Sequence, residues 1–376
     1  MRCFLLIIAG LLFAAGCGEN APETADNETD TGQTEVRTLV KIDSIGVELG
    51  DSTLVFGAIE GMVTGPDGNI AVLDRAACCI KIFTTEGDFV RQISRRGNGP
   101  GELISTGFLA ITGNGTLILA GDGSETVGVH SFDYFTGSWT GSETSYGAPP
   151  TCLEGASGAT YMRKSLEMDP TSDEPVAIAR ITLNEIGREE PLVLFQETRI
   201  PLNLENMGEV VSLVWFGYDL ACDFSGRFYV APRSTQEAVV YAYDAAGEEL
   251  FTIVPDGEPT LRSLEELETE RLVLAAKATA MDSAEIIPSL QPDPYKPMIR
   301  GLEVDAEGNL WVLAGGPAQP TFQVFDRTGC YLYTAVLQGE VPDGHSWNFN
   351  FSGGNILAYA EDPALGFQKL YVLALE

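Results

Sequence analysis

One unit of sequence recurs along the chain and limits the possible folds more than any other feature. Each copy is a turn that ends in Gly, a strand rich in β-branched and aromatic residues, a second strand and another turn that ends in Gly. The clear copies occupy residues 66–87, 224–247 and 306–329, and their two turns are 19, 21 and 21 residues apart. A fixed internal period predicts a repeat architecture. Consecutive strands with no helix between them predict antiparallel sheets.

Weaker copies fill the gaps between the clear ones and bring the number of units to six. An interval of 43–47 residues between successive first-turn glycines suits one four-stranded blade, and two longer intervals, of 68 and 82 residues, contain insertions. We therefore predict an all-β fold, a six-bladed β-propeller of four-stranded antiparallel blades. The first-turn glycines are Gly68, Gly115, Gly158, Gly226, Gly308 and Gly354.

The longest interval is predicted to contain a helix near residues 263–280. Ser263 and Glu266 fit a capping box, in which each side chain binds the backbone amide of the other residue. Prolines from residue 288 onward exclude further helix. We expect the segment to lie across the propeller rather than to form a separate domain. The apolar residues expected on one helix face are Leu264, Leu267, Leu274 and Ala278.

A strand-like segment at residues 37–42 precedes the first unit and has no blade of its own. The last unit, in contrast, has few residues left for its outermost strand. A ring with an unpaired strand edge is open to aggregation. We therefore predict that residues 37–42 pair with the last blade and close a propeller that spans residues 37–376.

The chain begins with the features of an export signal, because Arg2 precedes an apolar run at residues 4–15 that is too short to span a membrane. The run leads into Gly16-Cys17, which resembles the lipobox of bacterial lipoproteins. The resemblance implies cleavage before Cys17 and lipidation of that residue; an ordinary secretory signal is the alternative. Residues 1–16 are thus predicted to be a lipoprotein signal peptide. Residues 17–36, which are acidic and contain no aromatic residue, are predicted to be a lipid-anchored tether.

The charge of the chain excludes some partners. It has 54 acidic and 22 basic residues, a net charge of −32. Nucleic acid requires a cationic surface, and anionic lipid headgroups attract one, so we predict neither as a docking partner. The acids are dispersed along the sequence, which favours a hydrated, self-repelling surface over a cation site. No cofactor is predicted, although calcium is left open.

The cysteines and histidines give no metal motif. Five cysteines remain after the signal and the anchor, an odd number, and the sequence leaves their disulfide pairing open. No Cys-x-x-Cys pair is present, and His130 and His345 lack the short spacing of a strong metal site, so no metal ligand is predicted. The five cysteines are Cys78, Cys79, Cys152, Cys222 and Cys330.

Residues 73–87 resemble an NHL-type propeller repeat, and residues 97–103, Gly-Asn-Gly-Pro-Gly-Glu-Leu, resemble a linker of the six-bladed β-propeller lipoproteins of bacterial envelopes. Blades two and three depart from this pattern, because no Asp closes the strand after Leu119 or Met162. The resemblance implies a propeller fold and a location in the cell envelope, and it indicates almost nothing about an activity. Enzymes similar to NHL proteins hold metals with histidines and acids around the central channel.

Three residues are the candidate binding residues: Asp74, Arg95 and Arg96. The carboxylate of Asp74 is favoured as a structural acceptor for the turn that follows it. Arg95 and Arg96 precede the glycine-rich segment 97–101 and could hold an anion, although paired arginines in an acidic protein more often neutralise carboxylates. The segment itself lacks the Lys-Ser/Thr ending of a phosphate loop and favours a crossover between blades, whose glycines supply positive φ.

No nucleophile motif or catalytic constellation is visible, so no catalytic residue is predicted. The preferred hypothesis is a lipid-anchored propeller of the bacterial envelope, at the outer membrane, that binds a small ligand or an envelope protein at one end of its channel. The alternative is an envelope enzyme of the propeller lyase or hydrolase kind, with metal dependence open. A structural subunit of a surface assembly is a third possibility.

Overall fold

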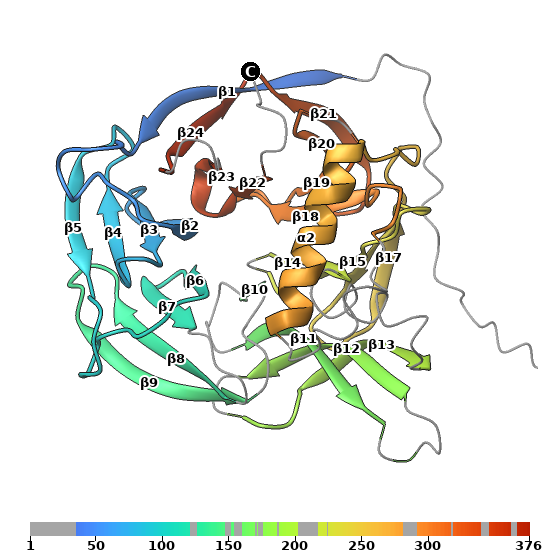
Figure 1. Cartoon of the computed structure of the whole chain (residues 1–376), viewed down its shortest axis with the longest axis horizontal. Helices are drawn as coiled ribbons and strands as arrows, with labels where there is room; N and C mark the ends of the chain where they lie inside the picture. Colours follow the sequence, from blue (N-terminus) through green and yellow to red (C-terminus); the bar gives the residue numbers. More distant parts are fainter. Residues whose placement is uncertain are drawn as a thin grey trace, which may run out of the picture.

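The computed structural model consists of β-sheets arranged in a ring, and the chain passes from one sheet to the next in order (Figure 1). Among the residues that the structure describes, four sheets have four strands each and a fifth has eight strands. The eight-stranded sheet contains two further four-stranded units, so the predicted six blades are present. The structure describes residues 35–120, 126–146, 152–153, 160–169, 171, 176–185, 188–201, 217–223, 225–280, 292–316, 319–339, 346–361 and 367–376.

Blades one to three use consecutive strands, each antiparallel to the next. They are β2 (Ile59–Thr64), β3 (Ile70–Asp74), β4 (Cys79–Phe83) and β5 (Phe89–Ile93); β6 (Phe108–Ile111), β7 (Thr116–Ala120), β8 (Thr126–Asp133) and β9 (Trp139–Tyr146); and β10 (Cys152–Leu153), β11 (Thr160–Met168), β12 (Val176–Glu185) and β13 (Val193–Pro201).

Blades four to six continue the ring, and the last blade combines three C-terminal strands with the first strand of the chain. They are β14 (Tyr218–Cys222), β15 (Phe228–Pro232), β16 (Val240–Tyr243) and β17 (Glu249–Ile253); β18 (Ile299–Val304), β19 (Leu310–Ala314), β20 (Thr321–Phe325) and β21 (Tyr331–Leu337); and β22 (Ser346–Asn350), β23 (Ile356–Glu361), β24 (Leu370–Leu375) and β1 (Val36–Ile45). A short 3-10 helix, η2 (Ser352–Gly354), follows β22.

The turns and the burial of the strands explain the repeated sequence. The turn before β3 places Gly68 at φ 83°, a conformation that glycine adopts without strain, and the side chain of Asp67 accepts a hydrogen bond from the amide of Asn69. Every residue of β3 and β4 is buried, because neighbouring blades cover both faces of the middle strands. The outer strand β5 has residues that alternate between exposed and partly buried. The hydrophobic cores therefore lie between blades, as in the cluster that joins strands of blades five and six around Trp311 and Phe322.

The first strand closes the ring as predicted. Strand β1 is antiparallel to β24, with Leu39 opposite Leu375. It also pairs with β21 of blade five, in parallel, with Leu39 opposite Leu337. The sequence did not indicate this second pairing, which makes blades five and six one continuous sheet.

The predicted helix is present as α2 (Leu264–Ala280) and crosses one end of the ring (Figure 1). Its capping box is confirmed: the amide of Ser263 donates to Glu266 Oε2 at 2.7 Å, and the amide of Glu266 donates to Ser263 Oγ at 3.1 Å. The expected apolar face is only partly correct. Leu274 is 3% exposed but Leu264 is 87% exposed, so the first residue of the helix is not part of a buried face. None of the helices that the structure describes is long and apolar enough to span a membrane.

Candidate functional site

The first strand of each blade lies closest to the axis of the ring, so these strands line the central channel (Figure 1). A cavity of about 190 Å³ lies among β2, β6 and β22. The polar residues of its lining are Glu60, Asn348, Asn350 and Tyr359, and the apolar residues include Phe108 and Phe349. The channel thus has a small cavity with hydrogen-bonding groups held on rigid strands.

One structural position recurs at the same end of blades one and four. The amide of Arg75, just after β3, donates to the carbonyl of Ala58, and the amide of Arg233, just after β15, donates to the carbonyl of Gly217. An acidic residue follows each of these carbonyls by two positions, Glu60 in blade one and Asp219 in blade four, and it forms an ion pair with the arginine of the same blade. Arg75 Nε lies 2.8 Å from Glu60. Arg233 binds Asp219 through two hydrogen bonds of 2.6 and 2.8 Å.

Blade five has the opposite arrangement at this position. The residue after β19 is Gly315, whose amide donates to the carbonyl of Met298, and two residues beyond that carbonyl stands Arg300. The arginine thus occupies the place of the acid, and no side chain occupies the place of the arginine. A side chain at Gly315 would collide with the carbonyl oxygen of Pro297 and would touch Cγ of Arg300 at 3.3 Å. A β-bulge between Ile299 and Gly301 sets the direction of Arg300, as the bulge between Ile59 and Gly61 does for Glu60.

Helix α2 brings further charges to this end of the ring. Lys296 Nζ lies 2.6 Å from Glu266, and Arg262 Nη2 lies 3.8 Å from Glu270. Arg233 also donates a hydrogen bond of 3.4 Å to the carbonyl of Arg300. Burial and the charge of the neighbouring Arg233 together lower the pKa of Arg300.

A second ionisable group, Glu303, lies further along β18. Burial raises its pKa from 4.5 to about 8, and the amide of Phe351 donates a hydrogen bond that opposes the increase. The carboxyl group is therefore largely protonated near neutral pH.

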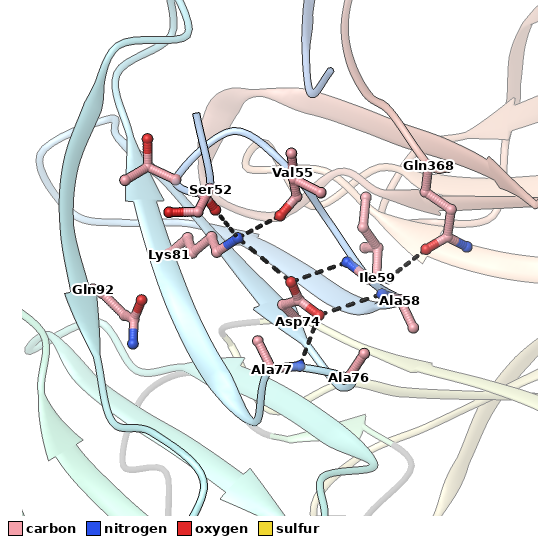
Figure 2. A network of polar contacts seen from close by, with 12 residues as sticks. Ser52, Val55, Ala58, Ile59, Asp74, Ala76, Ala77, Lys81, Gln92 and Gln368 are labelled. Carbon is pink, nitrogen blue, oxygen red and sulfur yellow. Dashed lines mark hydrogen bonds and ion pairs between the residues drawn. The ribbon is translucent and has the colours of Figure 1, made fainter. Parts of the chain in front are cut away.

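Asp74 lies inside blade one, not on the channel surface (Figure 2). It accepts hydrogen bonds from the amides of Ala77, at 3.1 Å, and of Gly57 and Ala58, at 3.2 and 3.3 Å. The Nζ of Lys81 lies 3.5 Å from the carboxylate, and both side chains are almost fully buried. The structural role favoured from the sequence is thus present, with Lys81 and the preceding segment as partners that the sequence did not indicate.

The same network fixes the segment between β1 and β2. Lys81 donates hydrogen bonds to the carbonyls of Ser52, at 3.1 Å, and Val55, at 2.6 Å. Gln368, between β23 and β24, accepts a hydrogen bond from the amide of Ile59 (Figure 2). Blade one is therefore attached to blade six through polar contacts as well as through its core.

Arg95 and Arg96 lie in the crossover from β5 to β6. Arg95 Nη2 lies 2.7 Å from Glu102, and Arg96 donates to the carbonyl of Ala76 at 3.0 Å. The amide of Gly99 donates to Glu102 at 2.9 Å. This bond, followed by the hydrogen bond from Arg95, lowers the pKa of Glu102. The carboxylate of Glu102 thus takes the place that a bound anion would have in this loop.

The remaining candidates are dispersed. His130 lies on β8, the third strand of blade two, where its Nδ1 is 2.8 Å from Ser142 Oγ. Cys78, Cys79 and Cys330 have free thiols, and Cys222 is partly buried at the end of β14. His345 and Cys17 fall outside the described residues, and nothing is described of the side chain of Cys152. Among the residues that the structure describes, no three His, Cys, Asp or Glu side chains form a group that could hold a metal.

Sequence reasoning missed Glu60, Asp219, Arg233 and Arg300. They are far apart in the chain, and each is an ordinary charged residue in its local context. The available signal was the alignment of the repeats, in which Ile59-Glu60-Gly61 corresponds to Ile299-Arg300-Gly301. Such an alignment shows a charge reversal at one position of blade five.

A comparison with models of protein families agrees with this architecture. Residues 33–130 match the model of a family described as "6-bladed beta-propeller". No curated protein matches the sequence. A protein of Bacteroides fragilis NCTC 9343 with a provisional name as an exported protein is 14% identical, with a TM-score of 0.45 over 91% of this chain and 100% of that one.

Two other solved structures have a similarly low likeness to this chain. The aldose sugar dehydrogenase of Streptomyces coelicolor is 10% identical, with a TM-score of 0.44 over 90% of this chain and 98% of that one. The calcium-binding protein regucalcin of Agrobacterium tumefaciens is 12% identical, with a TM-score of 0.38 over 89% and 96%. Likenesses this faint say nothing of the ligand of this chain. The chain is a six-bladed β-propeller, and its residues 33–130 match the family model that carries this description.

Proposed function

We propose that this protein is a ligand-binding propeller that a lipid on Cys17 anchors in the bacterial envelope, at the outer membrane. The tether of residues 17–36 would hold the ring at a distance from the membrane surface. The apolar run at residues 4–15 and the lipobox-like Gly16-Cys17 support this location in the envelope. The cavity of the central channel supports the binding role.

The observation that carries the binding proposal is the lining of this cavity. Glu60, Asn348 and Asn350, on the innermost strands, are among the residues that line it. Polar groups in fixed positions orient a small molecule in a site of this kind. The volume of about 190 Å³ is below the range of about 300–1,000 Å³ for drug-sized ligands, so the part of the ligand that enters is small and polar.

The test uses protein purified from native membranes in mild detergent. Small molecules released on denaturation are compared by mass spectrometry between the wild type and a variant with Asn348→Leu and Asn350→Leu. We expect at least one species to fall about tenfold or more in the variant, a loss of about 1.4 kcal/mol of binding free energy. Gln92→Leu, on the outer strand β5, is the matched control and should retain the wild-type level.

Equal release from all three proteins would refute a ligand in the channel. Chemical conversion of the retained species by the wild type would instead support the alternative of a propeller lyase or hydrolase. The anchor has a separate test: Cys17→Ser should abolish labelling by a radioactive fatty acid, and continued labelling of mature protein in that variant would refute lipidation.

A further inference from the structure

We propose that Arg300 and Arg233 form a binding site for an oxyanion group, a carboxylate or a phosphate, of a small solute at the end of the ring that α2 covers. This inference goes beyond the channel ligand and does not depend on the cavity among β2, β6 and β22. It rests on the arrangement of charged groups where blades four and five meet.

The first step is the absence of a partner for one arginine. In the part of the chain that the structure describes, the guanidinium group of Arg300 has no hydrogen bond and no ion pair. A guanidinium group carries five N–H donors, always keeps its charge and loses hydration when it is partly buried. The residues at the corresponding place of blades one and four, Glu60 and Asp219, each form an ion pair with an arginine within 2.8 Å. Arg300 is therefore the one charged residue at this place in the three blades that has no ion pair among the described residues.

The second step is the local charge. Asp219 neutralises Arg233 through two hydrogen bonds, and Glu266 neutralises Lys296 at 2.6 Å. Arg300 forms no ion pair among the described residues, although the negative charges of Glu266 and Asp219 act on it. Burial, and then the charge of Arg233, outweigh these two carboxylates, so the pKa of Arg300 is lowered. An oxyanion beside the two guanidinium groups would bring a further negative charge to Arg300 and accept hydrogen bonds from its N–H groups.

The third step is preorganisation. The bulge at Arg300 fixes its backbone, and the stem of its side chain lies against Gly315, where any larger residue would collide with the main chain at Pro297. The carbonyl of Arg300 also accepts a hydrogen bond from Arg233. The two arginines are thus held beside each other before any ligand arrives, and a preorganised donor set loses little entropy on binding.

The experiment measures binding to the full mature protein at constant ionic strength, with sodium chloride as the balancing salt. Inorganic phosphate and succinate are titrated separately, and the melting temperature is followed by intrinsic fluorescence. We expect a saturable rise for at least one anion, and the two titrations distinguish a phosphate site from a carboxylate site. Arg300→Met should weaken that binding by about tenfold or more, because the guanidinium donors are lost while the apolar stem is kept.

Arg271→Ala is the matched control. It removes one positive charge from the exposed side of α2, where Arg271 pairs with Glu268 at 2.7 Å, and it should retain wild-type affinity. If Arg300→Met fails to fold, Arg300→Lys gives the same test, because an ammonium group keeps the charge but loses the planar pair of donors. The variant with Asn348→Leu and Asn350→Leu should bind the anion with wild-type affinity. This result would distinguish failure of the channel-ligand proposal from failure of the anion-site proposal. Wild-type protein with no saturable response to either anion, or an Arg300 variant with unchanged affinity, would overturn the proposal.

Discussion

Substitution of Leu39 tests how much the first strand contributes to the stability of the ring. Leu39 is fully buried between β24 and β21, in the same core cluster as Trp311 and Leu373. Truncation of a buried leucine to alanine costs about 2–5 kcal/mol, through lost burial and the cavity left behind. Leu39→Ala should therefore remove a large part of a stability of about 5–15 kcal/mol. Ile42 lies on the same strand but is 61% exposed, so Ile42→Ala should change stability by about 0.5 kcal/mol or less.

Urea denaturation followed by tryptophan fluorescence measures both variants, and truncated chains extend the test. A chain that begins at Glu35 should unfold like one that begins at Gly18. A chain that begins at Asp51 loses β1 and its hydrogen bonds, such as the pair between Thr38 and Glu376 at 2.8 and 2.9 Å, and exposes two strand edges. It should aggregate or unfold at far lower urea. Equal midpoints for Leu39→Ala and Ile42→Ala, together with a stable chain from Asp51, would refute closure by β1.

Three further predictions concern single side chains. Below pH 4.5 Glu303 is protonated in both the folded and the unfolded chain, and between pH 4.5 and about 8 only the folded chain keeps the proton, so the stability of the wild type should fall as the pH rises through this window. Urea midpoints measured at pH 5.5 and 7.5 should show that Glu303→Gln gains about 1 kcal/mol or more of stability relative to the wild type over this interval. Parallel curves for the two proteins would contradict the raised pKa of Glu303. Lys81→Met leaves the buried carboxylate of Asp74 without its cation and should lower the free energy of unfolding by about 3–5 kcal/mol. Adding Asp74→Asn should restore part of this loss. Strictly additive losses in a double-mutant cycle would argue against an interaction between Lys81 and Asp74. Ser263→Ala removes a helix cap that contributes about 1 kcal/mol to stability. Amide hydrogen exchange should therefore accelerate in the first turn of α2 and stay unchanged in β3. Unchanged exchange in α2 would show that the capping box does not stabilise the helix.

Features set by neighbouring residues were predicted well from the sequence. The turn at Gly68 and the cap at Ser263 depend on contacts within a few residues, so their local patterns suffice. The pairing of β1 with β24 was also predictable, because a ring needs a partner for its last edge. The parallel pairing of β1 with β21 was not, since it depends on how closely two blades approach each other at one place in the ring.

The charged groups at the end of the channel could not be identified in the same way. Asp74, Arg95 and Arg96 stand in conspicuous motifs, yet Asp74 and Arg95 already have carboxylate or cation partners within the chain. Arg300 stands in no motif. Its significance comes from what its counterparts in blades one and four contact, and that comparison requires the register of three antiparallel strand pairs.

The two-sided pairing of β1 also bears on how the chain folds. Synthesis produces β1 first, but both of its partner strands lie in the last two blades, so it must wait until nearly the whole chain exists before it finds a place. Contacts between such distant segments form slowly, and an unpaired strand is exposed to wrong partners in the meantime. Blades one to five can form from consecutive strands, each as soon as it is complete. We therefore expect β1, the first of the described strands to be synthesised, to dock last, in the slowest folding step.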